Sequence, residues 1–207
     1  MRYGELTHSS DTPKYETCCV FDGATAITLE PDLYKRFIKC AKDELTASIW
    51  AYKDDWSESD GTTTQKWTLF SCQESGGFAI YESGNGAFIF VVGTGASSNS
   101  YIAKGTSTGY AGTLSPGWHM FTVTYNGLVG LGYIDGQLVT NTSAKYSTKT
   151  PMFYNAGTTT LHVGAEATAN STYQPMDNMY WNGKLSDFRV YTTALSADEV
   201  LKLYNGE

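Results

Sequence analysis

Apolar and polar residues alternate along Gly117–Thr140, a pattern typical of β-strands that bury one face. Two dipeptides, Asn126-Gly127 and Asp135-Gly136, divide this stretch into three parts. Both tolerate the positive φ angles of two-residue hairpin turns, whose twist matches that of the flanking strands. We therefore predict a meander of three strands. The two sides of its first strand are formed by Phe121, Val123 and Tyr125 and by Met120, Thr122 and Thr124.

The same alternation, or a short apolar run between turn residues, predicts strands along most of the chain. In Leu45–Lys53 the two sides are formed by Ala47, Ile49 and Ala51 and by Ser48, Trp50 and Tyr52. The other predicted strands are two within Cys18–Leu29, hinged at Asp22-Gly23, and one each in Lys66–Ser71, Gly77–Glu82, Ala87–Val92, Thr159–Ala165 and Trp181–Tyr191. So many short strands predict an all-β sandwich of two antiparallel sheets.

Helical patterns are confined to two short segments. In Pro31–Asp43 apolar residues recur at helical spacing after a proline, which predicts a short helix across an open end of the sandwich. Near the C-terminus, Ser196 and Glu199 form a capping-box pattern and Gly206 is placed to end the helix that it starts. We therefore expect the all-β fold to carry a short C-terminal helix.

The chain has 207 residues, of which 41% are hydrophobic, enough for one β-domain with its own core. We assign residues 17–207 to that domain. Residues 1–16 are polar and are expected to form an N-terminal arm or an edge segment. They hold no apolar stretch of the signal-peptide type, so we expect either that the protein is not exported by that route or that this is a piece of a longer chain.

The formal net charge is −7, and no Lys/Arg cluster stands out. This argues against nucleic acid and against an anionic membrane as partners, because phosphate binding needs a positive patch. No run of 18 apolar residues is present that would suggest a spanning segment.

Four cysteines, Cys18, Cys19, Cys40 and Cys72, allow three disulfide pairings, among which the sequence does not choose. Reduced thiols that pack as small apolar groups are the preferred interpretation, and a secreted disulfide framework is the alternative. The absence of CxxC spacing disfavours a zinc site.

Two further segments carry a family resemblance. WHMFTVTY with YIDGQLV, and WNGKLSDFRVYTTALSADEVLKLYN at the end, resemble laminin-G-like domains of the concanavalin A-like lectin/glucanase superfamily. CVFDGATAITL and LTASIWAYKDD are similar to the opening strands of that family, so the resemblance covers roughly residues 18–205. It implies a jelly-roll sandwich of two antiparallel sheets. It also implies a non-catalytic binding module of the type found in bacterial surface proteins and bacteriophage virions.

We expect no enzyme activity. Glucanases of the superfamily resemble one another in a Glu-x-Asp-x-x-Glu strand, and the nearest fragment here, Glu58-Ser59-Asp60, has Thr63 in place of the last carboxylate. Asp54 and Asp55 are adjacent and are interpreted as solvated turn residues. His119 begins a predicted buried strand, which favours a structural role over a catalytic one. We expect a large loss of stability on Trp118→Ala if that neighbouring ring is core.

A calcium ion is considered as a structural cofactor. The rim site that the resemblance implies is put in doubt by Gly95 and Ala96, which stand where an acidic ligand is expected. A different site can form between Asp22 and Asp187 if the first and last strands pair, since carboxylate oxygens suit calcium. The alternative for both residues is a local turn or cap.

Carbohydrate binding needs an aromatic face for the sugar's C–H groups and polar partners for its hydroxyls. Trp56, Tyr101 and Tyr173 lie in predicted polar loops, with Asn99, Asp177 and Asn178 nearby in sequence. Tyr52 and Tyr81 are predicted on a sheet face opposite the core, where they can line a shallow groove. Gly130 and Gly132 leave one strand face open to a ligand or to close packing.

Two functions therefore remain open. The first is a non-catalytic carbohydrate-binding or adhesion module that recognises a surface glycan or polysaccharide. The second is a structural or decoration domain that contacts other virion or surface proteins without a sugar site. Both place the chain on a virion surface or on the extracellular side of a cell surface. An exposed aromatic cluster beside Asn or Asp favours the first, and a dry apolar patch or an unpaired edge strand favours the second.

Overall fold

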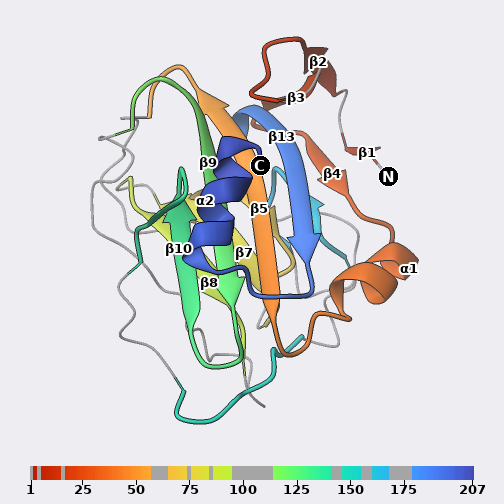
Figure 1. The fold of residues 1–207 in the computed structure, drawn as a ribbon. Helices are drawn as coiled ribbons and strands as arrows, with labels where there is room; N and C mark the ends of the chain where they lie inside the picture. The colour runs from red at the N-terminus through yellow and green to blue at the C-terminus, as the bar shows by residue number, and fades with distance from the viewer. Residues whose placement is uncertain are drawn as a thin grey trace.

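Two antiparallel sheets face each other in the computed structural model (Figure 1). The structure describes residues 2–3, 6–14, 17–56, 65–73, 76–83, 86–94, 114–140, 146–154, 160–167 and 179–207. The six-stranded sheet has the order β1 (Arg2–Tyr3), β4 (Ala26–Thr28), β12 (His162–Val163), β6 (Gln65–Ser71), β7 (Phe78–Ser83), β8 (Phe88–Val92). The seven-stranded sheet has the order β11 (Gln137–Leu138), β10 (Gly130–Ile134), β9 (Gly117–Tyr125), β5 (Leu45–Lys53), β13 (Asn182–Tyr191), β3 (Cys18–Asp22), β2 (Thr7–Ser9). This architecture confirms the predicted all-β, jelly-roll sandwich.

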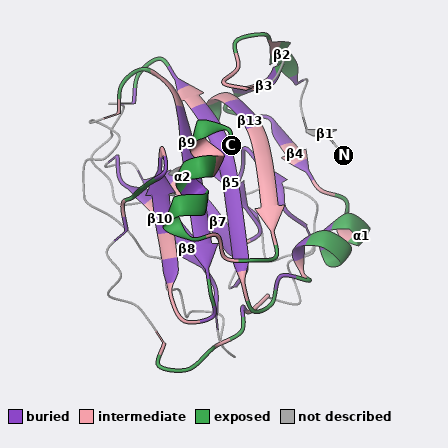
Figure 2. Cartoon of the chain, viewed as in Figure 1, coloured by how far each residue is buried: buried purple, intermediate pink, exposed green. Residues whose placement is uncertain are grey.

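The core lies between the sheets, as the buried strand residues in Figure 2 show. Phe121, Val123 and Tyr125 of β9 face it, as the alternation predicts, and so do the small and apolar residues Ala47, Ile49 and Ala51 of β5. Phe88 of the opposite sheet packs on Phe121 with ring centroids 4.5 Å apart. Removal of this apolar area from water stabilises the sandwich by about 25 cal/mol per Å².

The C-terminal helix α2 (Ala197–Asn205) covers part of the outer face of the seven-stranded sheet (Figure 1). Its predicted capping box is confirmed: the Glu199 N–H donates to Ser196 Oγ, and the Ser196 N–H donates to the Glu199 carboxylate. The helix ends at Gly206, whose φ is 84°. A second apolar cluster lies beneath the helix and comprises Trp50, Met120, Tyr133 and Val200.

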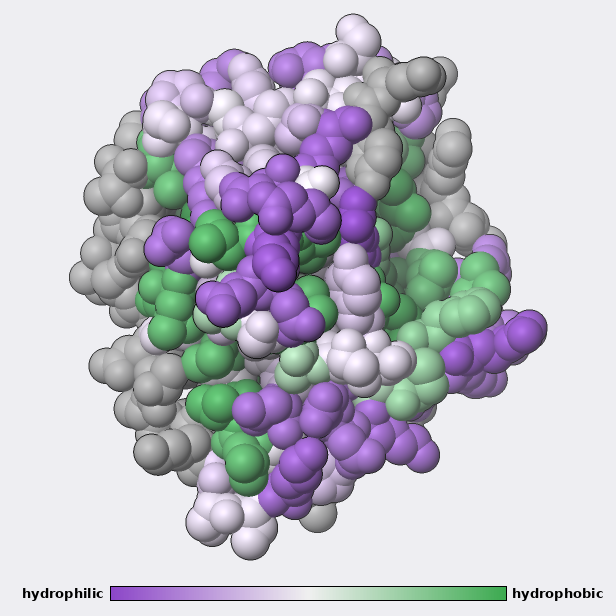
Figure 3. All heavy atoms as spheres, in the orientation of Figure 1, coloured by the Kyte–Doolittle hydropathy of each residue, from purple (hydrophilic) through white to green (hydrophobic). Residues whose placement is uncertain are grey.

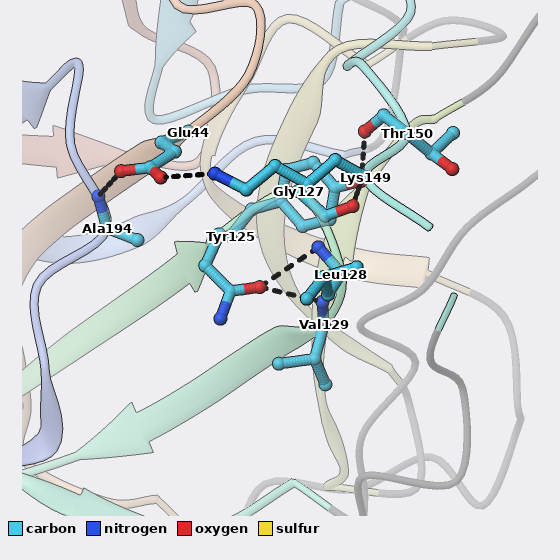
Figure 4. A network of polar contacts seen from close by, with 9 residues as sticks. Glu44, Tyr125, Gly127, Leu128, Val129, Lys149, Thr150 and Ala194 are labelled. Carbon is cyan, nitrogen blue, oxygen red and sulfur yellow. Dashed lines mark hydrogen bonds and ion pairs between the residues drawn. The ribbon is translucent and has the colours of Figure 1, made fainter. Parts of the chain in front are cut away.

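The two predicted tight turns differ in the structure. Asp135-Gly136 is a two-residue turn with φ angles of 51° and 76°, as predicted. Asn126-Gly127 instead begins a four-residue loop, because Tyr125 pairs with Gly130. Asn126 Oδ1 accepts the backbone N–H groups of Leu128 and Val129, and the Tyr125 hydroxyl donates to the carbonyls of Gly127 and Thr150 (Figure 4). These bonds satisfy the longer loop, so the two-residue prediction was wrong there.

Close packing, and not an open ligand face, explains the second glycine of β10. A Cβ atom placed on Gly132 would lie 2.4 Å from the Phe90 ring of the opposite sheet. The Gly132 N–H also donates to the Thr140 hydroxyl, 2.8 Å away. The glycine therefore lets a phenylalanine from the other sheet approach the backbone closely.

The N-terminal residues belong to the sandwich over their described part. β1 pairs with β4 and β2 pairs with β3, so the expected arm supplies an edge strand to each sheet. All four cysteines are free thiols. Cys18 and Cys72 are buried, as the preferred interpretation expects, but Cys19 is half-buried and Cys40 is exposed. In the described ranges no helix is long and apolar enough to cross a bilayer.

The predicted helix after β4 exists but changes type. α1 (Pro31–Leu33) continues into the π-helical turn η1 (Tyr34–Ile38), which buries Tyr34 and Ile38 against the core. Ile38 and Ala41 are buried, as the predicted apolar spacing requires, but Leu33 and Phe37, which belong to the same spacing, are 40% and 58% exposed.

Candidate functional site

A hollow of about 300 Å³ opens where β3 and β5 end and β13 begins. Its polar lining comprises Tyr52, Lys53, Asp54, Asp55, Asn182 and Lys184. β5 and β13 are antiparallel neighbours in which Tyr52 pairs with Lys184, and the same register brings Asn182 to the strand end beside Asp22. Strand pairing therefore gathers hydrogen-bonding side chains from distant parts of the sequence at one opening.

An aromatic pair stands beside this hollow on the outer face of the seven-stranded sheet. Tyr52 of β5 lies directly opposite Trp118 of β9 in the register, and their ring centroids are 5.5 Å apart at an interplanar angle of 58°. Both side chains are half-buried. They lie on the side of their strands that points away from the core, as Met120 does two residues after Trp118. The pair offers apolar ring surface to solvent next to polar groups.

The N-terminal segment contributes a carboxylate to this aromatic pair. Asp11 Oδ2 lies 2.5 Å from Lys184 Nζ, and Asp11 Oδ1 accepts the Trp118 indole N–H at 3.3 Å. The Lys184 ammonium lies 4.2 Å from the centroid of the Tyr52 ring. The hydrogen bond from Lys184 lowers the pKa of Asp11, and the same bond raises the pKa of Lys184. Asp11 therefore fixes the positions of both Trp118 and Lys184.

The Tyr52 hydroxyl is held as a donor. It donates to Asp54 Oδ1 at 2.6 Å, and this hydrogen bond raises the pKa of Tyr52 above its ordinary value. Asp54, predicted as a solvated turn residue, is therefore also an orienting partner of an aromatic ring at the site.

Beneath the hollow, a buried lysine is surrounded by tryptophans. The Lys53 ammonium lies 3.4 Å from the Trp67 ring centroid and 4.9 Å from that of Trp181. It also contacts Glu82 Oε2 of the other sheet at 3.2 Å, and both side chains are 5% exposed or less. This ion pair joins the two sheets under the site and holds the end of β5 in place.

Two of the predicted ligand-binding aromatics lie elsewhere. Trp56 was expected on an exposed loop, but it is only 1% exposed and packs among Phe88, His119, Phe121 and Trp181. Its indole N–H donates to the Gly117 carbonyl, so the residue closes the core below the loop. Tyr81 lies on the outer face of the six-stranded sheet, since its neighbour Ile80 faces the core. Tyr52 and Tyr81 therefore point to opposite sides of the sandwich and do not share a groove.

Five predicted site residues lie outside the described residues, and their assignment stays a prediction. They are Asn99, Tyr101, Tyr173, Asp177 and Asn178.

The two proposed metal ligands are not brought together. β3 and β13 do pair, but Asp22 lies opposite Asn182, five residues along the strand from Asp187. Asp22 Oδ1 accepts the Ala24 N–H, and Asp187 Oδ1 accepts from Arg189 Nε at 2.6 Å. In the described part of the chain no group of three or more His, Cys, Asp or Glu side chains is arranged to hold a metal ion. Calcium as a structural cofactor stays a prediction.

Sequence reasoning missed Trp118, Asp11 and Lys184. The alternation of side chains along β9 could have indicated Trp118, because Trp118 lies two residues from Met120 and therefore on the same, outward side of the strand. Asp11 and Lys184 are far apart in sequence, and only the pairing of β2 with β3 and of β3 with β13 brings them close.

The family model described as the concanavalin A-like lectin/glucanases superfamily (Laminin_G_3) matches residues 21–201. The chain belongs to this family. Its name covers both lectins and glucanases. No match is found among curated proteins.

Solved structures with the same fold include binding domains. Domain 4 of AbnA, an extracellular arabinanase from Geobacillus stearothermophilus solved with arabinotriose, is 15% identical with a TM-score of 0.56, covering 97% of this chain and 82% of that one. The receptor-binding domain of botulinum neurotoxin C/D mosaic serotype is 14% identical with a TM-score of 0.63, covering 100% and 46%. The binding domain of botulinum neurotoxin DC, solved with rat synaptotagmin II, is 14% identical with a TM-score of 0.60 and the same coverage. The chain thus spans less than half of these toxin domains, and at such identities the likeness shows the fold alone.

Proposed function

We propose that this chain is a non-catalytic carbohydrate-binding module, displayed on a bacterial cell surface or a phage virion, and that it binds glycan at the hollow beside Tyr52 and Trp118. The observation that carries the proposal is the aromatic pair beside the side chains of Asp54 and Asn182. A pyranose or furanose ring places C–H groups on an aromatic surface while its hydroxyls bond with neighbouring carboxylates and amides.

Two further observations support this proposal. The fold is shared with an arabinanase domain that was solved with arabinotriose, which is an oligosaccharide. The site residues are also held by their own contacts, since Asp11 fixes Trp118 and Asp54 orients Tyr52. Such pre-organisation lowers the entropy that ligand binding loses.

A glycan array, followed by titration of the best ligand, tests the proposal. Wild type is expected to bind, and Trp118→Ala and Tyr52→Ala are each expected to weaken binding about tenfold, the loss of roughly 1.4 kcal/mol of contact. Tyr81→Ala is the matched control, because Tyr81 is a half-buried strand tyrosine on the opposite side of the sandwich. Equal losses of glycan affinity in all three variants, or no saccharide bound by wild type, would contradict a glycan site at this location.

A decoration domain that docks on another protein is the second candidate. One observation favours it: β11 is the last strand of its sheet in the described part of the chain, and its Leu138 is 51% exposed. Edge strands of this kind can pair with a partner's strand. Binding to a protein of the same particle that Leu138→Asp abolishes, while the glycan array stays blank, would favour this function over the first.

A further inference from the structure

A cavity of about 260 Å³ lies between the two sheets, bounded by β3, β5 and β13 of one sheet and by β4 and β12 of the other. Its hydrocarbon lining is provided by Phe21, Ile27, Ile49, Val163, Leu185 and Phe188. Cys19, Ser186 and Asp187 complete the lining. Cys19, Ile27 and Phe188 are half-buried, so the cavity opens past these three side chains. Figure 3 shows apolar atoms at the surface between β13 and β4 as labelled in Figure 1.

A β-bulge in β13 makes room for this cavity. Between Ser186 and Arg189 the strand takes three steps while its neighbour β5 takes two. Asp187 lies within this interval and has a φ of 51°. As a result Leu185 and Phe188 both face the core and are three residues apart, whereas inward side chains of a regular strand are two apart. Bulges that redirect side chains in this way are over-represented beside functional sites.

Two aromatic walls of the cavity are held by contacts outside it. Phe21 lies against the backbone of Gly164, where a Cβ atom would come within 2.4 Å of the ring. Phe188 packs on Phe70 of the opposite sheet, with ring centroids 4.9 Å apart. Neither ring can turn into the space without losing these contacts. The packing of the fold therefore keeps the cavity open, although protein interiors are otherwise filled closely.

The chemistry of the lining favours an uncharged ligand. Asp187 is the one charged residue among the described lining, and its Oδ1 accepts from Arg189 Nε at 2.6 Å, so its charge is already balanced. A charged ligand would lose its hydration here without gaining a partner. Water is also poorly held by hydrocarbon walls, and an engineered cavity of about 150 Å³ with similar walls stays dry and binds benzene. The cavity of about 260 Å³ has room for a somewhat larger molecule.

We propose that the cavity beneath the β13 bulge is a binding site for a small, uncharged apolar molecule, such as an aromatic or branched hydrocarbon slightly larger than benzene. Burial of its surface against these walls supplies the binding free energy. A strand of a protein partner does not fit the site, because the described strands around the cavity are paired within their own sheets. The site is distinct from the proposed glycan site, although Phe21 lines both.

Titration of the full chain with toluene, followed by calorimetry and by the temperature of unfolding, tests this site. Wild type is expected to bind toluene and to unfold at a higher temperature in its presence, because a ligand that binds only the folded state stabilises it. Benzoate, which is similar in shape but negatively charged, is expected not to bind.

A substitution at the mouth of the cavity locates the bound toluene. Ile27→Phe is expected to weaken toluene binding about tenfold or more, because the larger side chain fills part of the cavity. Leu131→Phe is the matched control, since Leu131 is also a half-buried strand residue but packs in the cluster beneath α2. It is expected to leave toluene binding unchanged.

The thiol of Cys19 gives a measurement that needs no substitution. Alkylation by N-ethylmaleimide is followed at each cysteine by mass spectrometry. With toluene at about ten times its Kd, alkylation of Cys19 is expected to slow about tenfold, because only the unoccupied cavity exposes that thiol. Cys40, an exposed thiol outside the lining, is the internal control and should react at the same rate throughout.

Two results would overturn this site. The first is the absence of toluene binding by wild type. The second is toluene binding that neither Ile27→Phe weakens nor the alkylation of Cys19 detects, since the molecule would then lie elsewhere. Tyr52 and Trp118 take no part in these measurements, so the outcome does not depend on the glycan proposal.

Discussion

His119 and Asp135 lie 2.5 Å apart, Nδ1 to Oδ2, and join the start of β9 to the turn between β10 and β11. The other carboxylate oxygen of Asp135 accepts the Met120 N–H, and the other ring nitrogen of His119 is 2.8 Å from the Ser115 carbonyl oxygen. A carboxylate and a carbonyl only accept hydrogen bonds, so both ring nitrogens donate in the imidazolium form. Burial opposes the charge of His119, but the bonds to Asp135 and Ser115 raise its pKa.

This pair predicts a loss of stability as the pH rises. A histidine whose folded pKa is raised contributes stability that is complete below its unfolded pKa, about 6.5, and is lost as the pH rises through the folded pKa. We expect the difference in unfolding free energy between wild type and His119→Gln to be larger at about pH 6 than at about pH 9. Urea unfolding at both pH values measures it.

His162 predicts the opposite pH dependence. Its ring is fully buried on β12, Nδ1 lies 2.8 Å from the Thr28 hydroxyl, and burial lowers its pKa to about 4. At a pH between this folded pKa and the unfolded pKa of about 6.5, the unfolded chain therefore binds a proton at His162 that the folded chain does not bind. Stability is complete above about pH 6.5 and falls by roughly 3 kcal/mol as the pH drops to about 4, at 1.36 kcal/mol per pKa unit.

The measurement for His162 compares wild type with His162→Gln in urea between neutral and acid pH. Carboxylates that also titrate there are common to both chains, so the difference between the curves isolates His162. A wild-type curve that parallels the His162→Gln curve throughout would show that the ring is not protonated on unfolding.

Local patterns predicted the strands well because they depend on neighbouring residues. The alternation in Leu45–Lys53 and in β9 sets which side chains face the core, and the Ser196–Glu199 box needs only four residues. The Asn126-Gly127 turn failed because the Tyr125 hydroxyl bonds to the carbonyl of Thr150, a partner that local sequence does not indicate.

The candidate site was predicted poorly because it depends on register between distant strands. Tyr52 was predicted, but its partners Trp118 and Lys184 follow from the pairing of β5 with β9 and β13. The register also explains why Asp22 and Asp187 are apart. β3 and β13 pair as predicted, but their register places Asp22 opposite Asn182 and not opposite Asp187. A predicted loop position likewise does not indicate whether a side chain is exposed, because Trp56 follows a strand in a predicted loop and is buried.

Trp56 and Trp118 are expected to differ in how much they contribute to stability. Trp56→Ala should destabilise the fold by about 3–5 kcal/mol, because it empties a fully buried site among four aromatic rings. Trp118→Ala should cost only about 1 kcal/mol, because that ring is half-exposed on the outer sheet face and makes one hydrogen bond to Asp11. Denaturant unfolding of both variants checks the order. A larger loss for Trp118→Ala would place that ring in the core and remove it from the proposed glycan surface.

The buried ion pair under the site gives the last prediction. Lys53→Met leaves the carboxylate of Glu82, which is 0% exposed, without its cation, so we expect a loss of about 3–5 kcal/mol. Lys53→Met combined with Glu82→Met removes both charges and should recover most of that loss, since apolar groups of similar volume replace buried ion pairs at little cost. A double-mutant cycle in urea measures the coupling. If the losses of the two single variants simply add, Glu82 does not stabilise the charge of Lys53. The tryptophan rings around Lys53 would then stabilise it, since these cation–π contacts do not depend on the Glu82 carboxylate.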